Sequence, residues 1–111
     1  MIQFFPQYQS ESSTYYASHD IPSGQSGIIF VPSAAGGISL DIYANGAPCE
    51  FSIYVTNSSY QDAIDDADSV IWHPTSFRNY TTDLFTVLSA LAGAYKIIVT
   101  QGNLTVKVRG K

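Results

Sequence analysis

The clearest pattern in this chain is an alternation of apolar and polar residues within positions 38–56. Apolar residues take every second position over 38–44 and again over 51–55, after a six-residue connection. A period of two with one apolar face is typical of a half-buried antiparallel strand. If both apolar sets face one core, the two strands form a hairpin whose register is set by that core. This register pairs Ala44 with Phe51 and Ile42 with Ile53.

The remaining strands follow from shorter patterns. Residues 27–31 form a run of mainly β-branched and aromatic side chains, which indicates a strand buried on both sides. Residues 69–73 predict another strand, which Pro74 ends. Residues 95–100 and 104–109 predict a final hairpin, in which Gly102 supplies any positive φ that the turn needs. In its second strand Leu104, Val106 and Val108 face one way, and Thr105, Lys107 and Arg109 face the other.

Residues 83–92 fit two structures. Leu84, Leu88 and Leu91 have helical spacing, whereas the alternation of Phe85 and Val87 with their neighbours fits a strand. Since every other element is predicted to be β, we expect a strand here.

The first 24 residues differ from the rest of the chain. They carry several aromatic residues without a clear period, and Pro6 interrupts them. Because aromatic side chains bring large apolar areas that are usually covered, we expect an extended N-terminal arm that packs on a neighbouring subunit, with a short strand near residues 14–18. The alternative is an ordinary first strand of the same sandwich. The aromatic residues of this arm are Phe4, Phe5, Tyr8, Tyr15 and Tyr16.

Together these elements predict an all-β protein. About seven or eight short strands at this spacing are typical of an antiparallel β-sandwich, either jelly-roll or immunoglobulin-like. The chain has 111 residues, enough for one domain with its own core. We therefore expect an arm over residues 1–24 and a β-sandwich domain over residues 25–111.

Composition narrows the classes of partner. Charged residues make up 13% of the chain, about half the average, and the net charge is −4. Basic residues gather only in the tail, at Lys107, Arg109 and Lys111, which argues against nucleic acid as a partner. No apolar run is long enough for a membrane helix, and no signal-peptide pattern opens the chain. We expect assembly in a cytoplasm, with no membrane partner.

Candidate chemistry is sparse. Asp62, Asp65, Asp66 and Asp68 lack the alternating acids and glycine of a calcium loop, so a hydrated surface loop is the favoured interpretation. His73 would need an aspartate partner in a cleft to act as an acid or a base. Cys49 has no neighbouring cation to activate it, and no nucleophile or cofactor motif is present. We expect no catalytic residues, no metal, no cofactor and no enzyme activity.

Tyr43 and Tyr54 are expected on the outer face of the central hairpin. In the predicted register Tyr54 lies opposite Asp41, which makes the two tyrosines diagonal neighbours. With Trp72 nearby they could stack a sugar ring, as in a carbohydrate-binding module. They could equally anchor a subunit interface, where tyrosine and tryptophan are enriched, or meet the arm.

Several features of residues 27–110 form one pattern. A strand ends in Val70-Ile71-Trp72-His73, and a threonine-rich loop follows it. Residues 92–99, the 101–103 turn and a basic final strand complete the pattern. In this pattern residues 27–110 resemble the small all-β accessory proteins of tailed-phage virions. Proteins of this group decorate or cement capsids, or lie in necks, tails and fibres, and the group has no catalytic residues to carry over.

The resemblance implies a virion structural protein, most simply a capsid cement or decoration protein. Its partners would be the major capsid protein or other virion proteins, and it would form a homo-oligomer. The alternatives are a neck, tail or fibre component, a carbohydrate-binding module and, more distantly, a small hydrolase. The residues expected to contact partners are Phe4, Phe5, Tyr8, Tyr15, Tyr16, Tyr43 and Tyr54.

Overall fold

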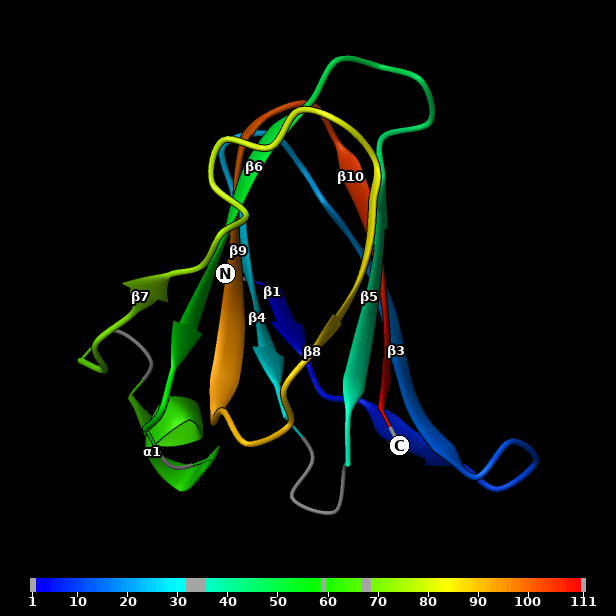
Figure 1. The fold of residues 1–111 in the computed structure, drawn as a ribbon, viewed down its shortest axis with the longest axis vertical. Coiled ribbons are helices and arrows are strands. Elements are labelled where there is room, and N and C mark those ends of the chain that lie inside the picture. The colour runs from blue at the N-terminus through cyan, green and yellow to red at the C-terminus, as the bar shows by residue number, and fades with distance from the viewer. Residues whose placement is uncertain (1, 32–35, 59, 67–68, 111) are drawn as a thin grey trace.

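The computed structural model of this chain is a sandwich of two five-stranded β-sheets (Figure 1). It describes residues 2–31, 36–58, 60–66 and 69–110. Within these residues, ten strands and one short helix follow one another along the chain. They are β1 (Ile2–Phe4), β2 (Gln7–Gln9), β3 (Thr14–Ile21), β4 (Ser26–Phe30), β5 (Ile38–Tyr43), β6 (Glu50–Thr56), α1 (Tyr60–Asp65), β7 (His73–Pro74), β8 (Leu84–Leu88), β9 (Ala94–Gln101) and β10 (Leu104–Gly110).

The strand order defines a jelly-roll. One sheet has the order β1-β4-β9-β6-β7 and the other β2-β3-β10-β5-β8; we name them the β9 sheet and the β10 sheet after their central strands. From β3 onward, consecutive strands lie in opposite sheets, except for β6 and β7. This double-sheet alternation is that of jelly-roll folds. The prediction of an all-β sandwich is confirmed, with ten described strands in place of seven or eight.

The core lies between the two sheets and is made by every second residue of the strands. In β5 and β10, and in β6 as far as Tyr54, the side chains alternate between buried and partly or fully exposed positions. Fully buried apolar side chains from both sheets meet in one cluster, which follows from the sequence period of two. This cluster includes Leu40, Ile42, Phe51, Ile53, Ile97 and Val106.

The predicted central hairpin is wrong in its pairing, although both of its strands exist. β5 pairs with β10 and β8, whereas β6 pairs with β9 and β7. Ile42 therefore lies opposite Val106 and Leu84, and Ile53 opposite Ile97. The two strands do face one core, but from opposite sides of it. The connection between them crosses from one sheet to the other (Figure 1).

The predicted final hairpin has the same outcome. β9 and β10 lie where the sequence predicts strands, yet they belong to different sheets. Gly102, in the turn between them, has a φ of 82°, so the expected need for positive φ is confirmed. Two further predictions are confirmed: residues 84–88 form a strand, and Ile28, Ile29 and Phe30 in β4 are buried on both faces of the sheet.

The segment before β8 differs from the prediction. The strand expected over residues 69–73 is reduced to β7, which pairs only through His73 and Pro74 with β6. The polar loop expected before it contains α1, while Asp68 lies outside the described residues. Trp72 packs instead on Ile28, Phe30 and Ala94, at the outer face of the β9 sheet.

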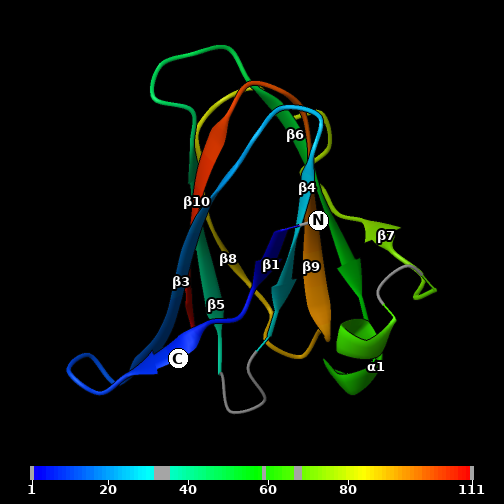
Figure 2. The same ribbon diagram turned by 180° about the vertical axis from the view of Figure 1, so that it is seen from behind.

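The N-terminal segment is not an arm separate from the sandwich. β1 runs parallel to β4 with Ile2 opposite Gly27, and β3 pairs with β10 from Tyr15 to Ile21 (Figure 2). The prediction is corrected to the alternative that the sequence left open, strands of the same sandwich. Its physical reason is that Phe4, fully buried, contributes to the chain's own core.

Candidate functional site

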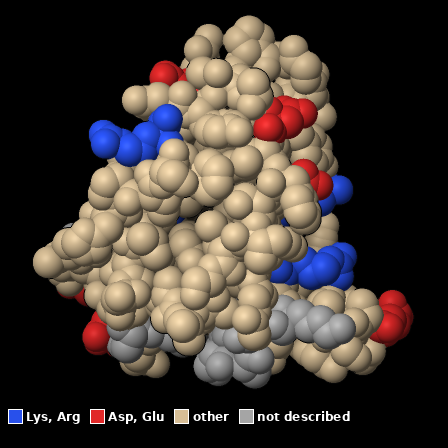
Figure 3. Space-filling view, viewed as in Figure 1, with Lys and Arg blue, Asp and Glu red and all other residues tan. Residues whose placement is uncertain are grey.

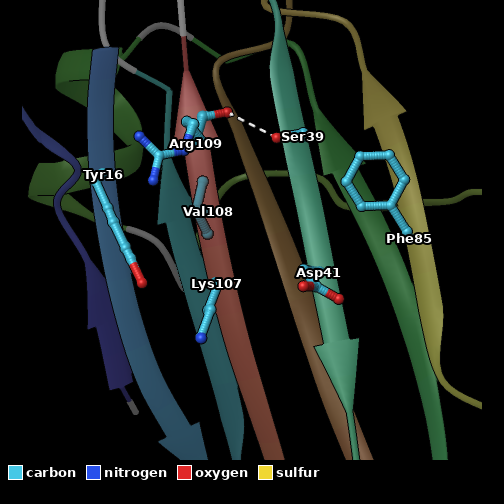
Figure 4. A pocket seen from close by; sticks show the side chains of 7 residues that line it. All are labelled: Tyr16, Ser39, Asp41, Phe85, Lys107, Val108 and Arg109. Carbon is cyan, nitrogen blue, oxygen red and sulfur yellow. Dashed lines mark hydrogen bonds between the residues drawn. The ribbon is translucent and has the colours of Figure 1, made fainter. Parts of the chain in front are cut away.

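The outer face of the β10 sheet brings together aromatic and charged side chains from neighbouring strands (Figure 4). Arg109 of β10 lies opposite Tyr16 of β3, and Lys107 lies opposite Asp41 of β5. Tyr43, the last residue of β5, lies on the same face of the sheet, opposite Thr105 of β10. We call Tyr16, Asp41, Tyr43, Lys107 and Arg109 the aromatic–cationic face.

The sequence of β10 explains why its cations point outward. Val106 and Val108 are almost fully buried between the sheets, and Lys107 and Arg109 alternate with them on the solvent side. This orientation was predicted from the period of two and is confirmed. Because β10 is the central strand, its cations lie in the middle of the sheet rather than at a rim.

Both cations lie over aromatic rings. The Lys107 Nζ is 5.5 Å from the centre of the Tyr43 ring, and the Arg109 guanidinium carbon is 4.9 Å from that of Tyr16. Such cation–π contacts contribute about 0.5–1 kcal/mol each at exposed sites. Arg109 Nη1 also donates a hydrogen bond of 2.8 Å to Thr14 Oγ1. These contacts fix the orientation of otherwise flexible side chains before any partner binds, which reduces the entropy lost on binding.

Lysine is charged at physiological pH, and the surroundings of Lys107 favour its charged form further. A side-chain hydrogen bond with Tyr43 is the main cause that raises the pKa of Lys107 above its usual 10.5, with smaller electrostatic contributions from Tyr43, Tyr16 and Asp41. The face is therefore cationic over the whole physiological pH range.

A shallow cavity of about 180 Å³ lies between the cations and the edge of the sheet (Figure 4). Phe85 of β8, opposite Asp41, forms its apolar side, and 69% of its surface is exposed. Rigid aromatic rings beside arginine and apolar surface match the composition of protein–protein interfaces. The cavity is lined by Tyr16, Ser39, Asp41, Phe85, Lys107, Val108 and Arg109.

The predicted partner-binding aromatics of the N-terminal segment lie in several places. Phe4 is fully buried, with its ring 5.0 Å from that of His19, so it is not available to a partner. Phe5 is 37% exposed and stacks on Phe30. Tyr8 is 57% exposed and meets Tyr15 edge to face, at 5.4 Å between ring centres. Of this group, only Tyr16 joins the aromatic–cationic face.

The tyrosine pair of the predicted hairpin does not exist. Tyr43 lies in the β10 sheet, while Tyr54 lies in the β9 sheet opposite Lys96 and Pro74. Trp72 is also on the β9-sheet side, where Lys96 Nζ lies 5.6 Å from its ring. The three aromatics proposed for a sugar platform therefore lie on two different surfaces, because β5 and β6 are not paired.

His73 and the aspartates are not assembled into one site. His73 is exposed in β7, opposite Val55. The surface depression beside Asp62, Asp65 and Asp66 is lined also by serines and by Val70 and Ile71, but not by His73. Among the residues that the structure describes, no group of three histidine, cysteine or acidic side chains is arranged to hold a metal ion.

Cys49 is a core residue. Its side chain is 4% exposed, and burial, together with the negative charge of Asp83, raises the pKa of its thiol above 9.0. Asp83 itself accepts a hydrogen bond from the backbone N–H of Ala44, at 3.0 Å.

Sequence reasoning missed part of this surface. Lys107 and Arg109 were expected to face outward, and Tyr16 and Tyr43 were singled out as partner-binding residues. What could not be read was that β10 lies between β3 and β5, which brings the four together. The exposed Phe85 was also missed, since alternation in 83–92 did not tell which side faced the core.

Comparison with known proteins supports the fold. The chain matches no protein-family model, and no curated protein matches it in sequence. The SPBc2 prophage-derived protein YomS superposes with a TM-score of 0.50 and 10% identity, over 86% of this chain and 93% of YomS.

The described helix is too short to cross a membrane.

Two thiamin pyrophosphokinases give the same superposition score. The enzyme from Candida albicans has a TM-score of 0.50 and 7% identity over 85% of this chain, and the enzyme from Geobacillus thermodenitrificans has 0.50 and 10% over 88%. This chain spans 31% and 37% of their lengths. At these identities the likeness concerns the fold alone. The chain is thus a small all-β protein of the double-sheet class.

Proposed function

We propose that this protein is a non-enzymatic structural component of a tailed-phage virion, of the capsid cement or decoration type. The observation that carries the proposal is the aromatic–cationic face, an open, preorganised surface on the central strands of one sheet. Tyrosine and arginine are the residues that most often dominate binding at protein interfaces. A neck, tail or fibre position is the alternative within the same class.

Two further observations support this class. The low charged fraction of 13% suits a chain with much of its surface covered by protein. A prophage-derived protein of similar length shares the double-sheet fold. By contrast, both tyrosine rings of the face are covered by cations, which leaves less ring surface to stack a sugar.

The proposal predicts that a charge reversal in the face weakens binding to phage heads. Lys107→Glu places a carboxylate beside Asp41 and removes the cation over Tyr43, so we expect at least about tenfold weaker binding, or roughly 1.4 kcal/mol. Labelled protein is mixed with purified heads and tails of the phage that encodes it, and the bound fraction is measured by sedimentation.

Lys96→Glu is the matched control, because Lys96 makes the same kind of contact with Trp72 on the other sheet. Binding to heads that Lys107→Glu weakens and Lys96→Glu leaves intact supports the cement assignment, and the same result with tails supports the alternative position. Absence of the protein from purified particles by mass spectrometry, or equal effects of the two variants, would contradict the proposal.

A further inference from the structure

β8 exposes a sheet edge without the usual protection. It pairs with β5 along one side, and no other described strand pairs with its second side. An edge strand presents unpaired N–H and C=O groups that can pair with another chain. In β8 the five residues Leu-Phe-Thr-Val-Leu include no charge, no proline and no glycine.

The other three edges of the described sheets differ from β8. β1 and β2 have three residues each, and β2 is polar at both ends. β7 has two residues, one of which is Pro74. Short length, polar side chains and proline are the devices by which proteins block edge pairing. β8 is thus the longest and the least protected of the four edges.

The sequence of β8 complements itself around Thr86. In an antiparallel pair of two β8 strands centred on Thr86, each Phe85 lies opposite Val87 of the other copy, and each Leu84 lies opposite Leu88. Phe85 and Val87 point to the outer face and are 69% and 68% exposed. Aromatic and β-branched residues form favourable cross-strand pairs of about 0.2–1 kcal/mol each.

Charge also favours a second copy over other occupants. Figures 1 and 3 share one view, in which the surface over β8 carries no blue or red atoms and the charged atoms lie mainly towards the periphery. A two-fold interface brings identical surfaces together, so any charge in its centre would meet the same charge. Asp41 lies opposite Phe85 but on β5, one strand away from the axis, so the centre of such an interface carries no charge.

We propose that β8 pairs with β8 of a second copy across a two-fold axis at Thr86, which joins two β10 sheets into one ten-stranded sheet. Two five-residue strands bury less than the roughly 1,200–2,000 Å² of a standard interface. The dimer therefore forms weakly, at micromolar or higher concentration. The proposal does not depend on the proposed virion function, because it concerns the isolated protein.

The first experiment is sedimentation of the pure protein over concentrations from about 10 μM to about 1 mM. The average mass of the wild type should rise from 12.1 kDa towards twice that value. Val87→Lys, which puts a charge at the outer face of β8, should remain at the monomer mass, with circular dichroism showing an unchanged fold. Ile71→Lys is the matched control, since Ile71 is 70% exposed but precedes Trp72, which packs on the β9 sheet, and it should dimerise like the wild type.

The proposal is overturned if the wild type stays monomeric at the highest concentration. It is overturned equally if Ile71→Lys abolishes dimerisation, whether or not Val87→Lys does, or if Val87→Lys still dimerises like the wild type.

A second experiment tests the register. Phe85→Cys and Val87→Cys are made separately in a Cys49→Ala background, mixed and oxidised. Opposite residues of an antiparallel pair have Cβ atoms close to the disulfide range. The mixture should therefore form a disulfide-linked heterodimer faster than either variant alone forms a homodimer. Equal rates in all three samples would overturn the register centred on Thr86.

Discussion

At the scale of single residues, Gly102 shows how tightly the connections between the sheets are built. Its φ is 82°, and a Cβ at this position would lie 2.5 Å from the carbonyl oxygen of Pro48 and 3.2 Å from Cys49 Cα. The turn after β9 therefore lies directly against the two residues that precede β6, where no side chain fits.

Gly102→Ala should cost about 2–5 kcal/mol of unfolding free energy, the sum of left-handed backbone strain and overpacking. Gly24→Ala is the control, because Gly24 has a similar φ of 80°. A Cβ at Gly24 would meet no atom within 4 Å other than those of its chain neighbours. It should lose only the backbone part, about 1–2 kcal/mol. Urea unfolding measures both, and equal losses would show that the contact with Pro48 has no energetic weight.

Two buried weak acids, the Cys49 thiol and the Tyr95 hydroxyl, cause the stability of the fold to fall at alkaline pH. Burial raises the pKa of Cys49 above 9.0 and that of Tyr95 above 10.0. The Tyr95 hydroxyl also donates a 2.6 Å hydrogen bond to the Ser89 carbonyl, which requires its proton. The folded protein thus keeps protons that the unfolded chain releases, and stability falls as pH rises through this range.

We therefore expect a constant free energy of unfolding near pH 7–8 and a decline above about pH 9. Cys49→Ala should remove the loss of unfolding free energy that begins near pH 9. Tyr95→Phe should remove the further loss that begins near pH 10. Unfolding by urea at each pH provides the measurement. An unchanged slope in both variants would mean that other groups cause the decline.

At the scale of elements, β1 fills a position prepared by β4. A Cβ on Gly27 would meet the Phe4 ring and the Ile21 side chain at 2.8 Å, so this glycine makes room for both. The aromatic leader could be recognised in the sequence as surface that must be covered. The sequence could not show that β4 and β3 of the same chain cover it. The parallel pairing of β1 with β4 leaves no local period around Pro6.

Phe4→Ala should accordingly destabilise the protein by about 3–5 kcal/mol, the usual cost of removing a buried phenylalanine ring. Phe5→Ala, which removes a side chain that is 37% exposed on Phe30, should cost clearly less. Thermal or urea unfolding of the two variants gives the comparison. Similar small losses for both would indicate that β1 is not part of the stable core in solution.

The pairing of β5 and β6 shows the limit of period-two reasoning. The alternation in both segments correctly identified which side chains face the core. It could not say whether the two strands lie side by side or face each other across that core, because both arrangements bury the same residues. The same ambiguity affected β9 and β10, where a short turn joins opposite sheets.

At the scale of the whole molecule, strands far apart in sequence lie together. β3 pairs with β10, and β4 pairs with β9. Sequence patterns were sufficient for the sandwich class, the positions of most long strands and the outward direction of Lys107. The aromatic–cationic face was beyond them, since it depends on β10 lying between β3 and β5, a long-range choice without a local signal.

The crossing from sheet to sheet has a consequence for the exposed loop between β5 and β6. A break in the backbone near Asn45 would leave two fragments, one with β1 to β5 and the other with β6 to β10. Each fragment would contribute strands to both sheets. Neither fragment can leave without peeling strands away from the other in both layers at once. Strands of the two fragments thus pair with each other within both sheets. This loop is therefore the natural point at which to divide the chain into two fragments that complement each other.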